Sequence, residues 1–367
     1  MSFCLKRNVP TNADDEYANK RQKVASGTSH PVISTTSGLL ALPVELFENI
    51  CDELLIGLRP ITREDTIFSS EYLKGAEFTS SASLLRPLVQ TCRALRAAYL
   101  ARYYEHIEVC ICRHSGVHWY QELSRRLQKI SEGLIGFPAL AKHVRKITVS
   151  LTSCDADTVF PLFARCLSQL PNLHTLRILF TPSKMTTPLR DAFSQYKYPQ
   201  IRTIILPSCA HAILRSCPEV RDVTCNSNKG STLLSTIFKD CPHVEVIDGV
   251  DWTEKMQERL LKVIPNLRAL HLRAGDKINA FQGLKQISHI SISFKMEMGN
   301  RSKDITRNID ALEESSRSLL DQAKVVLENS SVEQGKFVRL IYMVPDPDKG
   351  TYYRPAWKAV RMKRIDV

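Results

Sequence analysis

Four side chains between residues 110 and 118 carry atoms that could bind a metal ion. The stretch "CICRHSGVH" supplies two thiols and two imidazoles, from Cys110, Cys112, His114 and His118. Sulfur and ring nitrogen are ligands that zinc prefers in proteins. The same stretch also fits a β-strand, because apolar residues alternate with others from Ile107 onward. The strand accounts for the pattern without a metal, and we expect neither a metal ion nor a cofactor.

The sequence lacks the motifs of the common catalytic sites. It contains no Walker phosphate loop, no Rossmann glycine fingerprint, no nucleophile elbow and no HExxH zinc motif. The 14 glycines do not cluster, and the ten histidines have no acidic residue at a fixed offset that would make a general base. We therefore expect a binding protein and not an enzyme.

Charge and composition favour protein partners. The 367 residues are 43% apolar, which is enough for a sizeable core. The formal charge of +12 is spread along the chain, without the concentrated basic stripe of a nucleic-acid binder. We do not expect nucleic acid as a partner, although a protein that binds it with basic ends is a further alternative.

Cysteine content and hydropathy indicate the compartment. The eleven cysteines have no regular spacing, and the N-terminus "MSFCLKRNVP" lacks the apolar region of a secretory signal. No run approaches the 18 consecutive apolar residues that a membrane span requires. We expect a chain with free thiols in the nucleus, the cytoplasm or both, and no membrane association.

Residues 1–38 are polar and lack apolar periodicity, so we expect a disordered basic tail. Two basic clusters on a flexible spacer resemble a bipartite nuclear localisation signal, formed by Lys6, Arg7, Lys20, Arg21 and Lys23. A solvated charged tail explains the same residues, and both interpretations stay open.

Two segments after the tail have broad apolar helical faces. In "LLALPVELFENICDEL", Pro43 suits the first turn of a helix whose apolar stripe is Leu42, Leu46, Ile50 and Leu54. The segment "LLRPLVQTCRALRAAYLARYYEHIEV" predicts a second helix, with Leu88, Cys92, Leu95 and Tyr99 on one face and Val89 beside it. Each arc is wider than one packing partner requires, which favours a binding site for another protein.

Seven segments after residue 140 share one apolar pattern. Each has an aliphatic residue, a second three positions later and usually a third two positions after that, beginning at Val144, Leu173, Ile201, Val220, Val244, Leu267 and Ile287. These starts are 19 to 29 residues apart, the span of one strand and one return helix in a leucine-rich solenoid. Helical patterns lie between several of the segments, and five prolines precede the strands in one register: Pro171, Pro199, Pro218, Pro242 and Pro265.

The two helical segments and the repeats together resemble a known family. "LPVELFENICDEL" followed by "LVQTCRALRAAYLARYYEHIEV" is similar to the F-box, with its opening Leu-Pro-x-Glu-Leu and a later Val, Cys and Leu helix. The resemblance implies an adaptor of an SCF (Skp, cullin, F-box) ubiquitin ligase, a noncatalytic subunit in ubiquitin-dependent protein degradation. Its F-box would bind the Skp-type linker, and through it a cullin, while leucine-rich repeats capture an unknown protein substrate.

The resemblance assigns roles to individual residues. The linker-binding candidates are Leu42, Pro43, Leu46, Ile50, Leu54, Leu88, Val89, Cys92 and Leu95, although some of them could instead form the core of the box. Strand residues between the repeated aliphatics point to the concave surface, where the substrate-binding candidates are Arg177, Asp222, Asp248, His271 and Arg273.

The expected fold is an α/β repeat: a small helical F-box, then a leucine-rich-repeat-like solenoid of one strand plus one helix per repeat, with a helical C-terminal cap. The expected segments are the tail 1–38, the helical domain 39–109 with a long internal loop near 57–83, the solenoid 110–298, the cap helix and strand 299–350 and a basic tail 351–367. The alternative function is a repeat scaffold that binds a protein without recruiting a cullin. In an adaptor the apolar stripe of the first helix must be free, whereas in a scaffold it can pack on the solenoid.

Overall fold

The computed structural model describes residues 43, 45–46, 49–50, 53, 73–74, 81–112, 118–227, 230–264, 266–295, 305–351 and 354–367. Two compact units divide the chain, Met1–Val44 and Glu45–Val367, and all these residues except Pro43 belong to the second. The predicted tail 1–38 and most of the predicted loop 57–83 lie outside the described residues.

The second apolar segment forms two helices where one was predicted. Helix α3 covers Ser81–Thr91 and α4 covers Arg93–Glu105. Cys92 separates them in an extended conformation, with φ −152° and ψ 169°. Because the break interrupts the helical periodicity, α4 can pack against α3 and bury apolar side chains of both. The prediction of one continuous helical face was therefore wrong.

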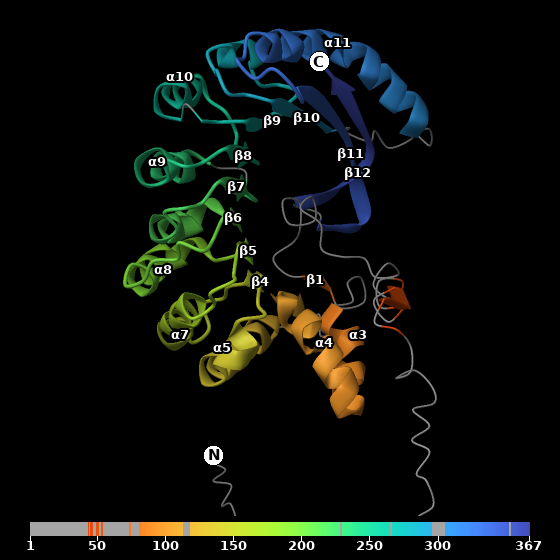
Figure 1. Ribbon diagram of the computed structural model, residues 1–367. Helices are drawn as coiled ribbons and strands as arrows, with labels where there is room; N and C mark the ends of the chain where they lie inside the picture. The colour runs from red at the N-terminus through yellow and green to blue at the C-terminus, as the bar shows by residue number, and fades with distance from the viewer. Residues whose placement is uncertain are drawn as a thin grey trace, which may run out of the picture. The chain divides into compact units, whose positions relative to one another are not determined.

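One sheet of ten strands dominates the second unit (Figure 1). Its spatial order is β12-β11-β10-β9-β8-β7-β6-β5-β4-β2, and every neighbouring pair is parallel except β11 with β12. The strands are β2 His106–Val109, β4 Lys146–Ser150, β5 Thr175–Phe180, β6 Thr203–Leu206, β7 Asp222–Cys225, β8 Val246–Asp248, β9 Ala269–Arg273, β10 His289–Lys295, β11 Phe337–Thr351 and β12 Arg354–Asp366. A separate small pair joins β1 Leu73–Lys74 to β3 Ile111–Cys112. The predicted α/β class is thus confirmed, and strands that succeed one another in chain order are compatible with the predicted repeat.

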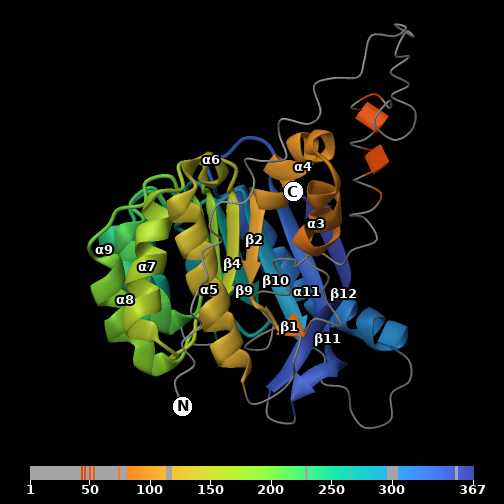
Figure 2. The same cartoon turned by 90° about the horizontal axis from the view of Figure 1, so that it is seen from below.

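Helical segments connect the strands and line one face of the sheet, as Figures 1 and 2 show for α5, α7, α8 and α9. The α-helices are α5 Trp119–Gly136, α6 Pro138–Ala141, α7 Ala156–Ser168, α8 Thr186–Phe193, α9 Ser231–Asp240, α10 Glu254–Val263 and α11 Ile305–Glu328. Three connections contain the tighter 3₁₀ form: η3 Ser183–Met185, η4 Ser208–Ser216 and η5 Ile278–Phe281. A 3₁₀ segment gains more length per residue, so it suits the shorter connections.

The core lies between the strands and these helices. The repeated aliphatics of the strands, such as Ile147, Leu176 and Ile204, are buried together with helix residues such as Phe163 and Leu167. Four of the five prolines stand in turns four residues before a strand, namely Pro171, Pro199, Pro218 and Pro242. Proline cannot continue a helix at these positions, because its nitrogen has no hydrogen to donate.

The C-terminal part differs from the prediction in one respect. The predicted cap helix and strand are present as α11 and β11, and Ala323, Val326 and Leu327 of α11 are buried in the same core. Residues 354–366, however, form strand β12 and pair with β11 over most of their length. The predicted basic tail 351–367 is therefore largely an edge strand of the sheet.

Candidate functional site

The helices α3 and α4 share a small apolar cluster of their own. Its buried members are Leu85, Val89, Leu95 and Tyr99. Two of the predicted linker-binding residues, Val89 and Leu95, therefore hold the helix pair together. Leu88 and Cys92 pack against the cluster and remain partly exposed, so they keep surface for a partner.

The first apolar segment exposes its aliphatic side chains. Residues 45–46, 49–50 and 53 are helical, and all of them are exposed. Leu46 and Ile50, one helical turn apart, are 47% and 40% exposed. Pro43 is exposed as well, whereas Leu42 and Leu54 lie outside the described residues. Two members of the predicted stripe are thus not covered by the core of the sheet.

The face of the sheet opposite the helices carries a row of cross-strand neighbours, which we call the central row. The register of the strands aligns Glu108, Thr148, Arg177, Ile205, Thr224 and Asp248, and then His271, Ser291 and Arg339. Side chains alternate between the two faces of a strand, so the aliphatics that flank these residues point into the core. Three predicted substrate-binding residues, Arg177, Asp248 and His271, belong to this row.

At the β2 end, the central row and its neighbours His106 and Lys146 form a group of titratable side chains, of which His106 and Glu108 are mostly buried. His106 lies next to Glu108 at 3.4 Å and shares a 2.8 Å hydrogen bond with the Thr148 hydroxyl. Burial, together with the positive Lys146 and Arg177, lowers the pKa of His106 to about 2, so the ring is neutral at physiological pH. Burial and Arg177 lower the pKa of Lys146 to about 8, against the attraction of Glu108.

At the β8–β9 end, Asp248 Oδ1 contacts His271 Nδ1. The neighbouring Trp252 donates its indole N–H to the His271 carbonyl at 3.2 Å. Both side chains of the pair are mostly buried. A carboxylate that accepts from one ring nitrogen fixes the orientation of the imidazole, so His271 presents a defined surface.

Arg273, another predicted substrate-binding residue, is held by acidic residues that lie just beyond two strand ends. Its guanidinium pairs with Asp251, which follows β8, and its backbone N–H donates to Asp276 Oδ2 at 2.6 Å. Burial raises the pKa of the Asp276 carboxyl, and the hydrogen bond from Arg273 opposes that rise. Asp222 lies on the same sheet face, at the start of β7 and two residues before Thr224 of the central row.

Sequence reasoning missed Asp251 and Asp276 as partners of Arg273. Both follow a strand of the repeat, and the carboxyl ends of parallel strands lie along one edge of the sheet. Their position after the strands was the signal by which the sequence could have predicted that these aspartates lie near Arg273. The Asp251–Arg273 pairing could not be read from the sequence, because it depends on the register between β8 and β9, whereas Asp276 meets the Arg273 backbone through a local turn.

The possible zinc ligands can be located only in part. Cys110 is buried between β2 and β3, and His118 is exposed before α5. His114 lies outside the described residues, as does the Cys112 side chain. Within the described part of the chain, no three His, Cys, Asp or Glu side chains are grouped to hold a metal ion. The residues of the predicted nuclear localisation signal, Lys6, Arg7, Lys20, Arg21 and Lys23, also lie outside it.

None of the helices that the structure describes is long and apolar enough to cross a membrane. Comparison of the sequence with known protein families and with curated proteins finds no match. The arrangement itself therefore carries the functional argument: an exposed aliphatic pair in the first helix, a separate helix pair, and a polar sheet face with fixed charges.

Proposed function

We propose that this chain is the substrate-recognition subunit of an SCF-type ubiquitin ligase. In this proposal the first helix with α3 and α4 is an F-box that binds a Skp-type linker and, through it, a cullin. The strands and helices that follow are leucine-rich repeats whose polar face captures a target protein. The chain performs no chemistry itself and raises the local concentration of a target lysine near the ubiquitin-charged enzyme.

The exposure of Leu46 and Ile50 carries the proposal. Aliphatic side chains one turn apart on a helix face form the anchor pattern of a helix that binds in an apolar groove. If the helix had packed on the sheet as part of a scaffold, these side chains would be covered. Their exposed fractions of 47% and 40% instead support a free stripe.

The polar sheet face supports the second half of the proposal. Fixed charges of both signs lie along it, from Lys146 and Arg177 at one end to the Asp248–His271 pair at the other. Partly buried, oriented polar groups reject partners that leave them unpaired, and this is how a surface selects one protein over others.

A binding measurement with purified Skp-type linker tests the proposal. Full burial of each aliphatic side chain contributes about 1.5 to 3 kcal/mol, so Leu46→Ala/Ile50→Ala should weaken binding about 100-fold or more. Leu42→Ala/Pro43→Ala should weaken it in the same direction. Circular dichroism should report an unchanged fold for both variants, because the two described side chains Leu46 and Ile50 are outside the core.

The matched control is Leu261→Ala/Val325→Ala, which truncates two exposed aliphatics on α10 and α11. This variant should bind the linker like the wild type. A folded wild-type chain that does not bind the linker would overturn the ligase assignment and favour the alternative, a repeat scaffold that binds proteins without a cullin.

A further inference from the structure

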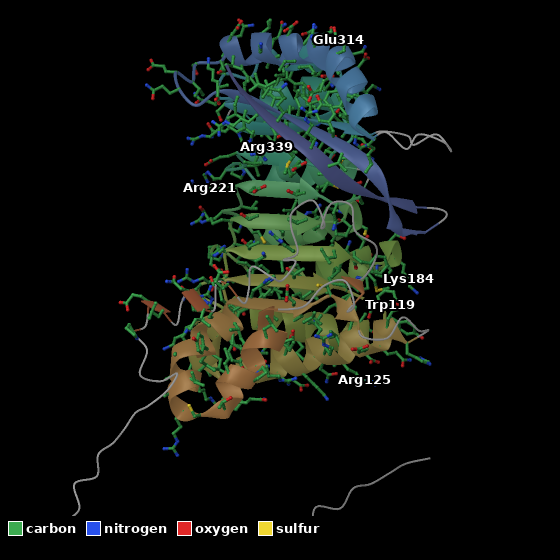
Figure 3. All side chains as sticks on the ribbon, turned by 90° about the vertical axis from the view of Figure 1, so that its right-hand side faces the viewer. Trp119, Arg125, Lys184, Arg221, Glu314 and Arg339 are labelled. Atoms are coloured by element: carbon green, nitrogen blue, oxygen red, sulfur yellow. The ribbon has the colours of Figure 1, made fainter. Side chains whose placement is uncertain are left out.

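Strand β12 ends the ten-stranded sheet and leaves one of its edges without a partner strand among the described residues. On an edge strand, alternate residues direct their N–H and C=O groups away from the sheet, where an extended chain can pair with them. Figure 3 shows β11 and β12 running together across the side of the sheet that faces the viewer, with Arg339 of β11 labelled. This edge is distinct from the first helix and lies next to the end of the central row, because Arg364 pairs with Arg339.

The regular part of this edge is short and well defined. From Arg361 to Asp366 each residue of β12 faces one residue of β11, Tyr342 to Phe337, without interruption. The register shifts between Tyr342 and Met343, where Val360 is the extra residue of a bulge. A bulge bends a strand and ends regular pairing, so an added strand would pair with the segment 361–366.

The side chains of this segment combine cations with one exposed apolar residue. Arg361 and Lys363 reach the same carboxylate, Glu313 of α11, at 3.3 and 3.5 Å. Met362 and Arg364 therefore point to the other face, where the Arg364 guanidinium lies 4.1 Å from the centre of the Phe337 ring and donates to Asp366 Oδ1 at 2.9 Å. Met362 is 59% exposed, which is the second-largest exposed fraction among the described large apolar side chains.

The geometry points to an acidic, extended peptide segment as the partner of β12. It would add as an eleventh strand beside residues 361–366, with apolar residues against Met362 and carboxylates near Arg361, Lys363 and Arg364. The backbone supplies the hydrogen bonds and the apolar contact adds affinity. The three cations outnumber their two carboxylate partners, Glu313 and Asp366, so the excess positive charge favours acidic sequences. This inference does not depend on the proposed ligase function.

Charge disfavours a second copy of the chain as the partner. Two β12 edges side by side would bring six cations together, since Arg361, Lys363 and Arg364 occur in each copy. Like charges directly opposite one another destabilise strand pairing. The whole chain also carries a formal charge of +12, which opposes self-association and favours an acidic partner.

Fluorescence anisotropy with the full chain and three labelled octapeptides tests the inference. The first alternates Glu and Val, the second Lys and Val, and the third Glu and Pro. The Glu–Val peptide should bind at least tenfold more tightly than the other two. The Lys–Val peptide removes the acidic charge. The Glu–Pro peptide keeps the charge but loses every second backbone donor, because proline has no N–H.

Substitutions in β12, compared with a charge-reversal control elsewhere in the chain, locate the site. Lys363→Glu/Arg364→Glu should weaken binding of the Glu–Val peptide at least tenfold, and Met362→Ser should weaken it severalfold. The control Lys184→Glu/Arg190→Glu makes the same change in net charge at two exposed residues outside β12 and should bind like the wild type. Hydrogen exchange should also slow at the amides of 361–366 when the peptide is bound.

Three results would overturn the inference. Equal binding of the Glu–Pro and Glu–Val peptides would indicate attraction by charge without strand pairing. Equal loss in both charge-reversal variants would mean that net charge, and not β12, attracts the peptide. If the wild-type chain forms concentration-dependent dimers through β12, the partner of this edge is a second copy of the chain and not an acidic peptide.

Discussion

At the scale of single residues, the polar face of the sheet owes its properties to burial. His106 is surrounded by Glu108, Lys146, Thr148 and Arg177, contributed by β2, β4 and β5. Its imidazole stays neutral because desolvation and two cations oppose protonation. A neutral ring can serve as a hydrogen-bond partner of Thr148 without adding charge to an already positive group.

We predict that stability falls with decreasing pH and that His106 is one cause. In the unfolded chain the imidazole takes up a proton near pH 6.5, whereas in the folded chain its pKa is about 2. Its contribution is therefore complete above about pH 6.5 and declines on acidification by up to about 1.4 kcal/mol per pH unit. Urea denaturation of wild type and His106→Gln at pH 7 and pH 5 measures the difference.

The glutamine variant should lose less stability between these two pH values, because its amide does not titrate and can still bond to Thr148. Lys146 does not disturb this comparison. Its folded pKa of about 8 lies below its unfolded value, so its contribution changes only above pH 8. Identical losses in the two proteins would contradict the prediction.

Sequence reasoning placed the candidate residues on the correct face but did not reveal their pairs. Alternation along each strand put Arg177, Asp248 and His271 opposite the core, and the structure agrees. Which acid meets which base depends on how neighbouring strands are aligned. For that reason the Asp248–His271 and Asp251–Arg273 pairs emerged only from the structure.

At the scale of elements, one glycine explains an irregularity of the repeat. Gly249 stands where most repeats have a third aliphatic residue. Its φ is +71°, and a Cβ built on it would lie 1.9 Å from the Cys225 carbonyl oxygen. A side chain is therefore excluded both by the backbone conformation and by the close approach of the neighbouring strand.

We predict that Gly249→Ala destabilises the protein more than Gly335→Ala. Gly335 has a similar φ of +75°, but nothing lies within 4 Å of its Cβ position. Its substitution should cost only the conformational strain of about 1 to 2 kcal/mol. Gly249→Ala adds a clash with backbone, so its midpoint in urea should be clearly lower. Equal midpoints would mean that β7 and β8 adjust to the extra methyl group.

Elements with a clear period were predictable, and those without one were not. The seven repeated strands follow one apolar pattern, and each is present. Strand β12 was predicted as a tail because its segment 354–366 is rich in basic residues and hides its alternation. Its pairing with β11 is a long-range property that local sequence does not express.

At the scale of the whole second unit, the apolar side chains form clusters of unequal size. The large core extends from Val109 near the first strand of the sheet to Val344 in β11. Among the described residues, the cluster of α3 and α4 contains four buried side chains. A small core supports less stability than a large one, so the two regions should open at different free energies.

Hydrogen exchange measured by mass spectrometry checks this difference. We predict that amides in α3 and α4 exchange at least about tenfold faster than amides in β4 to β9, because local opening of the pair exposes little apolar surface. Binding of the linker should slow exchange in α3 and α4 if the proposed function is correct. Uniform exchange across both regions in the free chain would show that they unfold as one.

The order of the strands also bears on how the molecule is made. From β4 to β11 each strand lies beside the one that precedes it in the chain, so the strand contacts join elements that are adjacent in sequence. Low contact order favours rapid folding, because short loops close at little entropic cost. The repeats can therefore assemble one after another as the chain leaves the ribosome, each new strand binding to the edge presented by the last.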